Sequence, residues 1–189
     1  ISGNTAEFRI NGMRASEYPA IDFSKPNECF NVSEDILKKI ILQTSFATSD
    51  KETRPVLTGV NFQCKEHQLH CVATDSYRLA KKTVEIEESL NFNITIPAKS
   101  LQEVVKTLEG EGDVEIAVND KKAQFIIHDT IVQTRLIDGV YPETSRLIPL
   151  QFDYELTIDA HDLLNAIDRA SFIKNDGVSV IKFNLSEQE

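Results

Sequence analysis

Apolar side chains recur at helical spacing in three stretches of the chain, and each stretch follows a short run typical of a strand. The predicted strands are residues 29–32, 92–96 and 154–158. Ser33 and Asp159 should be the N-caps of the first and third helices, and Pro97 should take the first helical position of the second. Their apolar stripes are Ile36, Leu37, Ile40 and Ile41 in the first, Leu101, Val104, Val105 and Leu108 in the second, and Leu163, Leu164, Ile167 and Ala170 in the third.

Between the helices the pattern is that of strands, with β-branched residues or alternating polarity. The predicted strands are residues 56–64, 69–73, 78–86, 113–118, 122–128 and 131–136. Asn119-Asp120 predicts a hairpin turn, and His67-Gln68 predicts a weaker one. One helix followed by about three strands, twice over, predicts the α+β class, with two helices packed against antiparallel sheets. Residues 144–154 should connect to a further domain.

The chain repeats part of itself at the scale of a domain. Residues 30–46 resemble residues 156–172 without a gap, an offset of 126 from Phe30 to Leu156, and both copies end in Ser-Phe. A period of this length is that of a domain and is too long for a solenoid. Val32 and Ile96 align at an offset of 64, about half the period. Each domain is therefore expected to contain two copies of one unit, and the chain to be a fragment of a longer protein.

Composition narrows the functional classes. The net charge of −10 argues against a protein that grips phosphates tightly, but allows one that retains nucleic acid by topology. The three cysteines are few and odd in number, so a disulfide framework is not expected. This favours a location in the reducing cytoplasm. No apolar run approaches the roughly 20 residues that a membrane span requires, so we expect no membrane partner.

Three ordered motifs carry a resemblance to a known family. They lie at residues 54–60 (Arg-Pro-Val-Leu-Thr-Gly-Val), 73–80 (Ala-Thr-Asp-Ser-Tyr-Arg-Leu-Ala) and 137–143 (Ile-Asp-Gly-Val-Tyr-Pro-Glu). With these motifs and the repeat, the chain resembles the bacterial replicative sliding clamp, the β subunit of DNA polymerase III. The resemblance implies a protomer of three similar domains, each a duplicated β-α-β-β-β unit, and a homodimer that closes into a ring around duplex DNA.

The resemblance also implies the domain boundaries. Residues 1–24 would end the first clamp domain, residues 25–150 would form a complete second domain, and residues 151–189 would begin the third. We expect this piece alone not to close a ring, because the family closes its dimer through the first and third domains. Residues 151–189 should be poorly anchored, because one strand–helix–strand piece cannot bury the core of a domain alone.

A cleft between the second and third domains is the partner-binding site that the resemblance implies. It would capture a short linear motif from the replicative polymerase, the clamp loader and repair proteins. Its positions in this chain would be Leu57, Thr74, Ser76, Tyr77, Arg78, Leu79, Pro142, Arg146 and Leu147. Ser76 and Tyr77 depart from the family pattern, which often has Gly and His there, and the opposite wall would lie in the rest of the third domain.

The resemblance implies a DNA-facing set as well, made of basic residues on the two helices and in the loop after the first. Its members would be Lys38, Lys39, Lys51, Arg54, Lys99 and Lys106. Acidic neighbours such as Glu103 dilute the positive charge, and a solvated helix face is the ordinary explanation for such lysines. We expect the helices to let DNA slide along the hole without gripping it.

Two further groups of polar residues bear on other possible functions. The cluster Cys64, His67, His70 and Cys71 has the chemistry of a zinc site, but its spacing fits no common motif, so we expect neither a metal nor a cofactor. His161-Asp162 lies at a helix start, where Asp suits the dipole, and no catalytic motif is visible. We therefore expect no enzyme. The alternatives are a stand-alone peptide-binding module that does not encircle DNA, and a metal-dependent enzyme that uses the Cys/His cluster.

Overall fold

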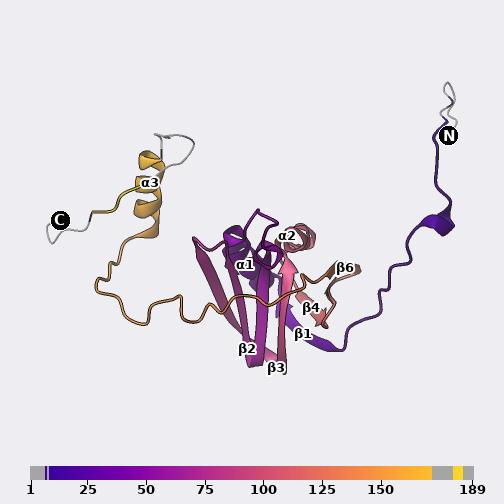
Figure 1. Cartoon of the computed structure of the whole chain (residues 1–189), viewed down its shortest axis with the longest axis horizontal. Coiled ribbons are helices and arrows are strands. Elements are labelled where there is room, and N and C mark those ends of the chain that lie inside the picture. The colour runs from indigo at the N-terminus through magenta and orange to yellow at the C-terminus, as the bar shows by residue number, and fades with distance from the viewer. Residues whose placement is uncertain (1–6, 8, 172–180, 185–189) are drawn as a thin grey trace. The chain divides into compact units, whose positions relative to one another are not determined.

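The computed structural model describes residues 7, 9–171 and 181–184, and it divides the chain into two compact units. The first comprises Ile1–Pro142 and the second Glu143–Glu189. Figure 1 shows that the first unit contains all the strands that the structure describes. Phe172, which closes the second copy of the sequence repeat, lies outside the described residues.

Two antiparallel sheets make up the first unit, which confirms the α+β class. The four-stranded sheet has the order β1 (Glu28–Ser33), β4 (Asp113–Val118), β5 (Lys122–Ile127), β6 (Thr130–Arg135). The second sheet pairs β2 (Gly59–Thr74) with β3 (Leu79–Pro97). β3 contacts both outer strands of the larger sheet, β1 and β6. The hairpin and the four-stranded sheet therefore pack around one core.

The long hairpin corrects two sequence predictions. The predicted strands 56–64 and 69–73 merge into β2, and 78–86 and 92–96 merge into β3. The predicted turn at His67-Gln68 is wrong, because β2 continues through a register shift between Glu66 and Gln68. Glu66 has a φ of 57°, so this one residue absorbs the irregularity as a bulge without reversing the chain. The reversal comes at residues 75–78.

Two helices cover the core of the first unit. α1 (Glu34–Thr44) follows β1, α2 (Ala98–Thr107) follows β3, and the two helices contact each other (Figure 1). The hydroxyl of Ser33 accepts a hydrogen bond from Ile36 N–H at 3.3 Å, as the predicted N-cap should. Pro97 is the residue just before α2, one position earlier than predicted. Short 3₁₀ turns complete the unit: η1 (Ala15–Glu17), η2 (Ser45–Ala47) and η3 (Pro55–Thr58).

One hydrophobic core is shared by both sheets and both helices. The rings of Phe30 on β1 and Phe92 on β3 stack with their centroids 5.7 Å apart, which joins the two sheets directly. From the helices, Leu37, Ile40 and Leu101 are fully buried against them. Ile36, which was predicted in the buried stripe of α1, is instead exposed.

Glu34 is buried in the first turn of α1, on the face that Leu37 shares. Its Oε2 accepts a hydrogen bond from Gly110 N–H at 2.6 Å, and its own N–H donates to Gly112 O at 3.0 Å. Nε2 of His128, in the turn between β5 and β6, lies 2.9 Å from Glu34 Oε1. The hydrogen bond from Gly110 lowers the pKa of Glu34, although burial opposes it. This carboxylate therefore ties together three separate segments.

The second unit contains α3 (Ala160–Ala170). The carboxylate of Asp159 accepts hydrogen bonds from His161 N–H and Asp162 N–H, which confirms Asp159 as the N-cap. Residues 154–158 are not a strand in the structure, because the described part of this unit offers no strand with which they could pair. No side chain of α3 is fully buried. Among the described residues, no helix is long and apolar enough to cross a membrane.

Gly59, at the start of β2, provides a test of the packing between the two strands of the hairpin. A Cβ at this position would lie 2.6 Å from Ile96 O and 2.7 Å from Thr95 Cγ2. We expect Gly59→Ala to lower the free energy of unfolding by about 1–3 kcal/mol, because the paired backbone must move. Urea denaturation of the variant measures this, with Gly12→Ala as the control, since a Cβ at Gly12 has no neighbour within 4 Å. Equal stabilities of the two variants would contradict the prediction.

The lowered pKa of Glu34 predicts that the stability of the fold depends on pH. Its pKa is lowered in the folded state from an ordinary value of 4.5, so its stabilisation is full above about that pH. The stabilisation is then lost as the pH falls through the lower folded pKa. We expect Glu34→Gln to be less stable than the parent at neutral pH and to lose less stability on acidification.

The measurement is chemical denaturation across the acid range. The matched control is Asp35→Asn, which removes the neighbouring carboxylate, an exposed group whose Oδ2 contacts Lys39 Nζ at 2.6 Å. Exposed pairs of this kind contribute little to stability. Equal shifts of the acid transition in both variants would mean that Glu34 does not hold the three segments together.

Candidate partner-binding site

The three sequence motifs, although far apart in the chain, meet at one place in the first unit. Tyr141 Oη accepts a hydrogen bond from Thr74 N–H at 3.0 Å, which joins the second and third motifs. Gly139 has a φ of 122°, and a Cβ there would lie 2.7 Å from Val56 Cγ1 in the first motif. Glycine is required at this position both for its backbone conformation and for the close approach. The structure thus explains why these distant stretches carry the resemblance together.

A small apolar cluster lies where the motifs meet, separate from the main core. Leu57, Val72 and Tyr141 are its buried members, and Val56 and Leu79 pack against them partly exposed. Burial raises the pKa of Tyr141, whose hydroxyl is held by Thr74. Leu57 is only 3% exposed, so it forms the floor of the surface, whereas Leu79 is available at its edge. Tyr141 and Val72 were not among the predicted site residues, although Tyr141 stands inside the third motif.

The loop at residues 75–78 is held by its own side chains. Oδ1 of Asp75 accepts hydrogen bonds from Tyr77 N–H at 2.9 Å and Arg78 N–H at 3.0 Å. These bonds lower the pKa of Asp75. The hydroxyl of Thr74 donates to Arg78 O at 2.7 Å and accepts from Ser76 N–H at 3.1 Å. Thr74 is one of the predicted site positions, and its hydroxyl is engaged within the loop.

Ser76 stands in the left-handed region, with a φ of 79°. This conformation disfavours residues with a Cβ, which is the physical reason why glycine suits the position. Tyr77 beside it is 97% exposed and has its ring free. The guanidinium of Arg78 is also largely exposed, with Nε donating to Asp75 Oδ2 at 3.0 Å. The loop is therefore ordered in its backbone and offers Tyr77 and Arg78 to solvent.

A hollow of about 220 Å³ lies between this loop and the first motif. Its lining consists of Ser49, Lys51, Thr53, Arg54, Leu57, Asp75, Ser76 and Tyr77. Lys51 and Arg54, predicted to face DNA, thus share a hollow with predicted partner-binding residues. Pro142 is exposed at the end of the first unit. Arg146 and Leu147 are exposed residues of the second unit, and their part in the site stays a prediction.

We use the term partner-binding surface for Leu57, Thr74, Ser76, Tyr77, Arg78, Leu79 and Pro142, all in the first unit. This surface has a half-exposed apolar edge at Leu79 and an exposed cation at Arg78. Such a combination suits a partner segment that has both an apolar side chain and hydrogen-bond acceptors.

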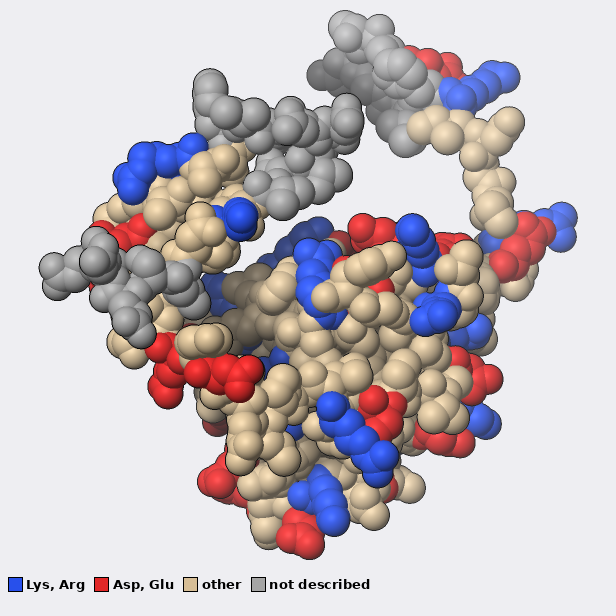
Figure 2. Space-filling view, turned by 60° about the vertical axis from the view of Figure 1, so that its left-hand side comes forward, with Lys and Arg blue, Asp and Glu red and all other residues tan. Residues whose placement is uncertain are grey.

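The remaining predicted DNA-facing residues lie on the helices of the first unit. Lys38 and Lys39 are exposed on α1, and Lys99 and Lys106 on α2. Lys39 pairs with Asp35 at 2.6 Å and Lys106 with Glu103 at 2.7 Å, which neutralises part of the positive charge. On the face that Figure 2 presents, basic and acidic side chains are interspersed. No uniformly basic field develops there.

The Cys/His cluster is divided between the inside and the outside of β2. Cys64 and Cys71 are buried in the main core, where burial raises the pKa of both thiols. His67 is exposed and His70 half-buried, with Nδ1 of His67 3.1 Å from Glu87 O. Side chains along a strand alternate between its faces, and this separation keeps thiols and imidazoles apart. The arrangement gives no support to a metal-dependent enzyme.

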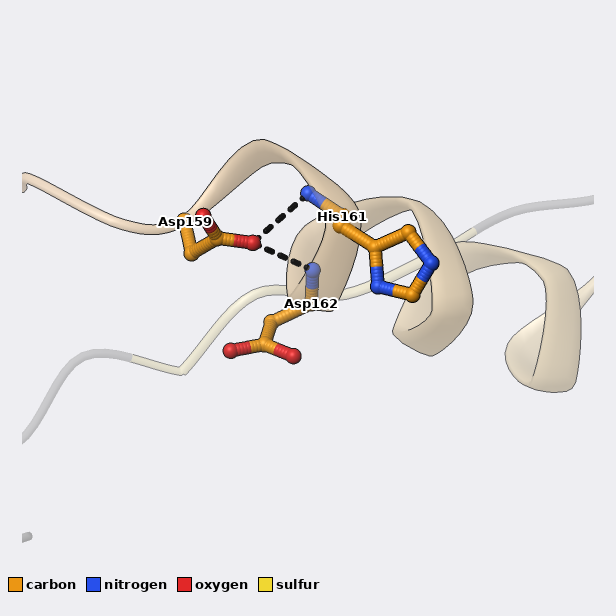
Figure 3. Close-up of side chains that lie close together, drawn as sticks. All are labelled: Asp159, His161 and Asp162. Atoms are coloured by element: carbon orange, nitrogen blue, oxygen red, sulfur yellow. Dashed lines mark hydrogen bonds between the residues drawn. The ribbon is translucent and has the colours of Figure 1, made fainter.

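Within the described residues, one group of potential metal ligands lies close together, at the start of α3. It consists of Asp159, His161 and Asp162 (Figure 3). All three are exposed, and Asp159 Oδ1 already accepts the two backbone hydrogen bonds drawn there. Nδ1 of His161 lies 3.0 Å from Asn165 Nδ2. Helix capping accounts for this cluster.

Comparison with known proteins agrees with this geometry. The family model described as the DNA polymerase III beta subunit, central domain, matches residues 31–143. The beta sliding clamp of Bacillus subtilis is 38% identical over 193 residues, which cover 100% of this chain and 51% of that protein. This chain therefore spans about half the length of that relative.

Solved structures give the same result. The crystal structure of the DNA polymerase sliding clamp from Bacillus subtilis superposes with a TM-score of 0.85 at 38% identity, covering 92% of this chain and 47% of that one. A sliding clamp from Bartonella birtlesii bound to griselimycin has a TM-score of 0.78 at 32% identity, with coverage of 87% and 46%. Because sequence, family model and fold agree over most of its length, the chain belongs to the DNA polymerase III beta subunit family, the bacterial beta sliding clamps.

Proposed function

We propose that this chain is part of a DNA polymerase processivity factor, a sliding clamp that encircles duplex DNA as a homodimeric ring in the cytoplasm. It carries out no catalysis. The replicative polymerase, the clamp loader and repair proteins bind it through a short linear motif, in a cleft that the partner-binding surface forms together with Arg146 and Leu147. The convergence of three distant motifs on that surface is the observation that carries the proposal.

The surface suits weak and exchangeable binding. Burying two large apolar side chains of a partner stabilises the complex by about 1.5–3 kcal/mol each. Ordering a flexible peptide costs part of this, so an affinity nearer micromolar than nanomolar follows. The preformed backbone of the 75–78 loop keeps that cost low on the clamp side. Partners that must replace one another on DNA require such an affinity.

Retention on DNA would come from ring closure and not from affinity. A net charge of −10 and lysines partly neutralised by Asp35 and Glu103 disfavour a tight grip on phosphates. Lys38, Lys39, Lys99 and Lys106 would face the duplex from the helices, with Lys51 and Arg54 in the loop after α1. A lining of mixed charge lets the duplex slide.

Removing Arg78 or Arg146 should weaken partner binding. We expect Arg78→Ala and Arg146→Ala, each in the full-length gene product, to raise the Kd for a partner peptide about tenfold, because each removes hydrogen-bond donors and aliphatic packing at the site. The probe is a fluorescein-labelled segment of the replicative polymerase that contains its clamp-binding motif, measured by fluorescence anisotropy. Unlabelled griselimycin, which the Bartonella birtlesii clamp binds, should displace it.

The control for this titration is Lys65→Ala, an exposed cation in the middle of β2. It should leave the affinity unchanged, which separates the loss of a specific contact from the loss of one positive charge. Unchanged affinity in both arginine variants would show that the peptide binds elsewhere.

Encirclement of DNA has a separate test. Full-length protein placed on a nicked circular plasmid by the clamp loader should stay bound during gel filtration at high salt, because a closed ring cannot dissociate sideways. Cutting the plasmid once should release it from the ends. Equal retention on linear and circular DNA, or no retention on either, would favour a peptide-binding module that does not encircle DNA.

A further inference from the structure

Phe46 is a large aromatic residue at the surface, and neither proposed set of site residues includes it. It stands in η2, directly after α1, and is 57% exposed. Its neighbours Ser45 and Ala47 are both buried, so the 3₁₀ turn is fixed from two sides and directs Phe46 outward. In the sequence it closes the segment that the chain repeats. Phe46 is not a member of the main core.

The ring of Phe46 lies beside the guanidinium of Arg78. Arg78 Cζ is 5.9 Å from the centroid of the ring, within the range of a cation–π contact. The guanidinium is also held by Asp75, whose Oδ2 accepts a hydrogen bond from Arg78 Nε at 3.0 Å. The two contacts use one face and one nitrogen of the group. The Nη donors at its end take part in neither.

We propose that Phe46 is a positioning residue of the partner-binding surface: it holds the guanidinium of Arg78 so that its Nη groups donate to an oxygen acceptor of the bound peptide. This inference rests on the proposed function. An arginine side chain has many rotamers, and fixing it before the partner arrives removes an ordering cost from binding. Phe46 itself does not contact the peptide.

The contact also joins two parts of the fold. Phe46 follows the helix that carries Lys38 and Lys39, whereas Arg78 belongs to the turn of the β2–β3 hairpin. Leu42 lies one helical turn before Phe46 and is similarly exposed, at 56%. Leu42 is as exposed as Phe46 but has no aromatic ring to contact an arginine. It is therefore the matched control for a general loss of exposed apolar surface.

The experiment measures the affinity of the labelled polymerase peptide for Phe46→Leu, Phe46→Tyr, Leu42→Ala and Arg78→Ala, and for the double variant Phe46→Leu with Arg78→Ala, all in the full-length protein. We expect Phe46→Leu to weaken binding about two- to fivefold, the loss of an exposed cation–π contact. Phe46→Tyr should keep the parental affinity, because the ring is retained, and Leu42→Ala should match the parent. Phe46→Leu should have no further effect once Arg78 is alanine.

A second readout needs no peptide. The ring current of Phe46 should displace the Cδ proton resonances of Arg78 in the free protein, and Phe46→Leu should return them to ordinary values while the melting temperature stays within a few degrees. If this displacement is absent in the parent, the stacking does not persist in solution and the inference fails.

The outcomes separate this inference from the function on which it rests. Parental affinity in Phe46→Leu, with weakened binding in Arg78→Ala, would overturn the positioning role and leave the binding surface intact. Equal weakening by Phe46→Leu with and without Arg78 would mean that Phe46 contacts the peptide itself, which also overturns it. Parental affinity in Arg78→Ala would instead contradict the proposed surface.

Discussion

The pairing of β2 with β3 is the interaction on which the rest of the first unit depends. Its ladder runs from Gly59 opposite Pro97 to Thr74 opposite Leu79, so it joins the two strands from end to end. At one end, Gly59 is close enough to Ile96 O to exclude a side chain, and α2 begins directly after the paired Pro97. At the other end the ladder closes into the loop that carries Tyr77 and Arg78. The strands that supply much of the core therefore also hold the candidate site.

This arrangement explains how an exposed loop can be rigid. Loops at the surface are usually more mobile than the strands that they connect. Here the carboxylate of Asp75 and the hydroxyl of Thr74 satisfy the backbone groups of the turn, and Tyr141 Oη holds Thr74 from the third motif. The polar groups of Thr74 and Asp75 are thus hydrogen-bonded within the unit. The groups that the loop leaves exposed are the half-exposed Leu79, the ring of Tyr77 and the end of the Arg78 guanidinium.

The charge of this molecule disfavours tight binding of DNA phosphates. The composition is acidic overall, and ion pairs on α1 and α2 neutralise part of the positive charge of those helices. The proposed encirclement of DNA requires no tight phosphate contacts, which would oppose movement along the duplex. Under the same proposal, specific recognition of partners is left to the small surface where Leu79 and the cation of Arg78 lie together.

The sequence by itself determined the elements whose signals are local. The helices of the first unit, the caps at Ser33 and Asp159 and the α+β class follow from spacing and residue type, and the motifs identified the family. Tertiary structure alone decided which residues those elements bury. Ile36 and Glu34 both stand at the start of α1, yet the carboxylate is buried, because Gly110 and His128 from distant segments surround it. Likewise β2 continues past His67-Gln68 because a partner strand pairs with both of its halves. Periodicity shows which residues share a face, but only the neighbours that cover that face decide whether it becomes core, floor or binding surface.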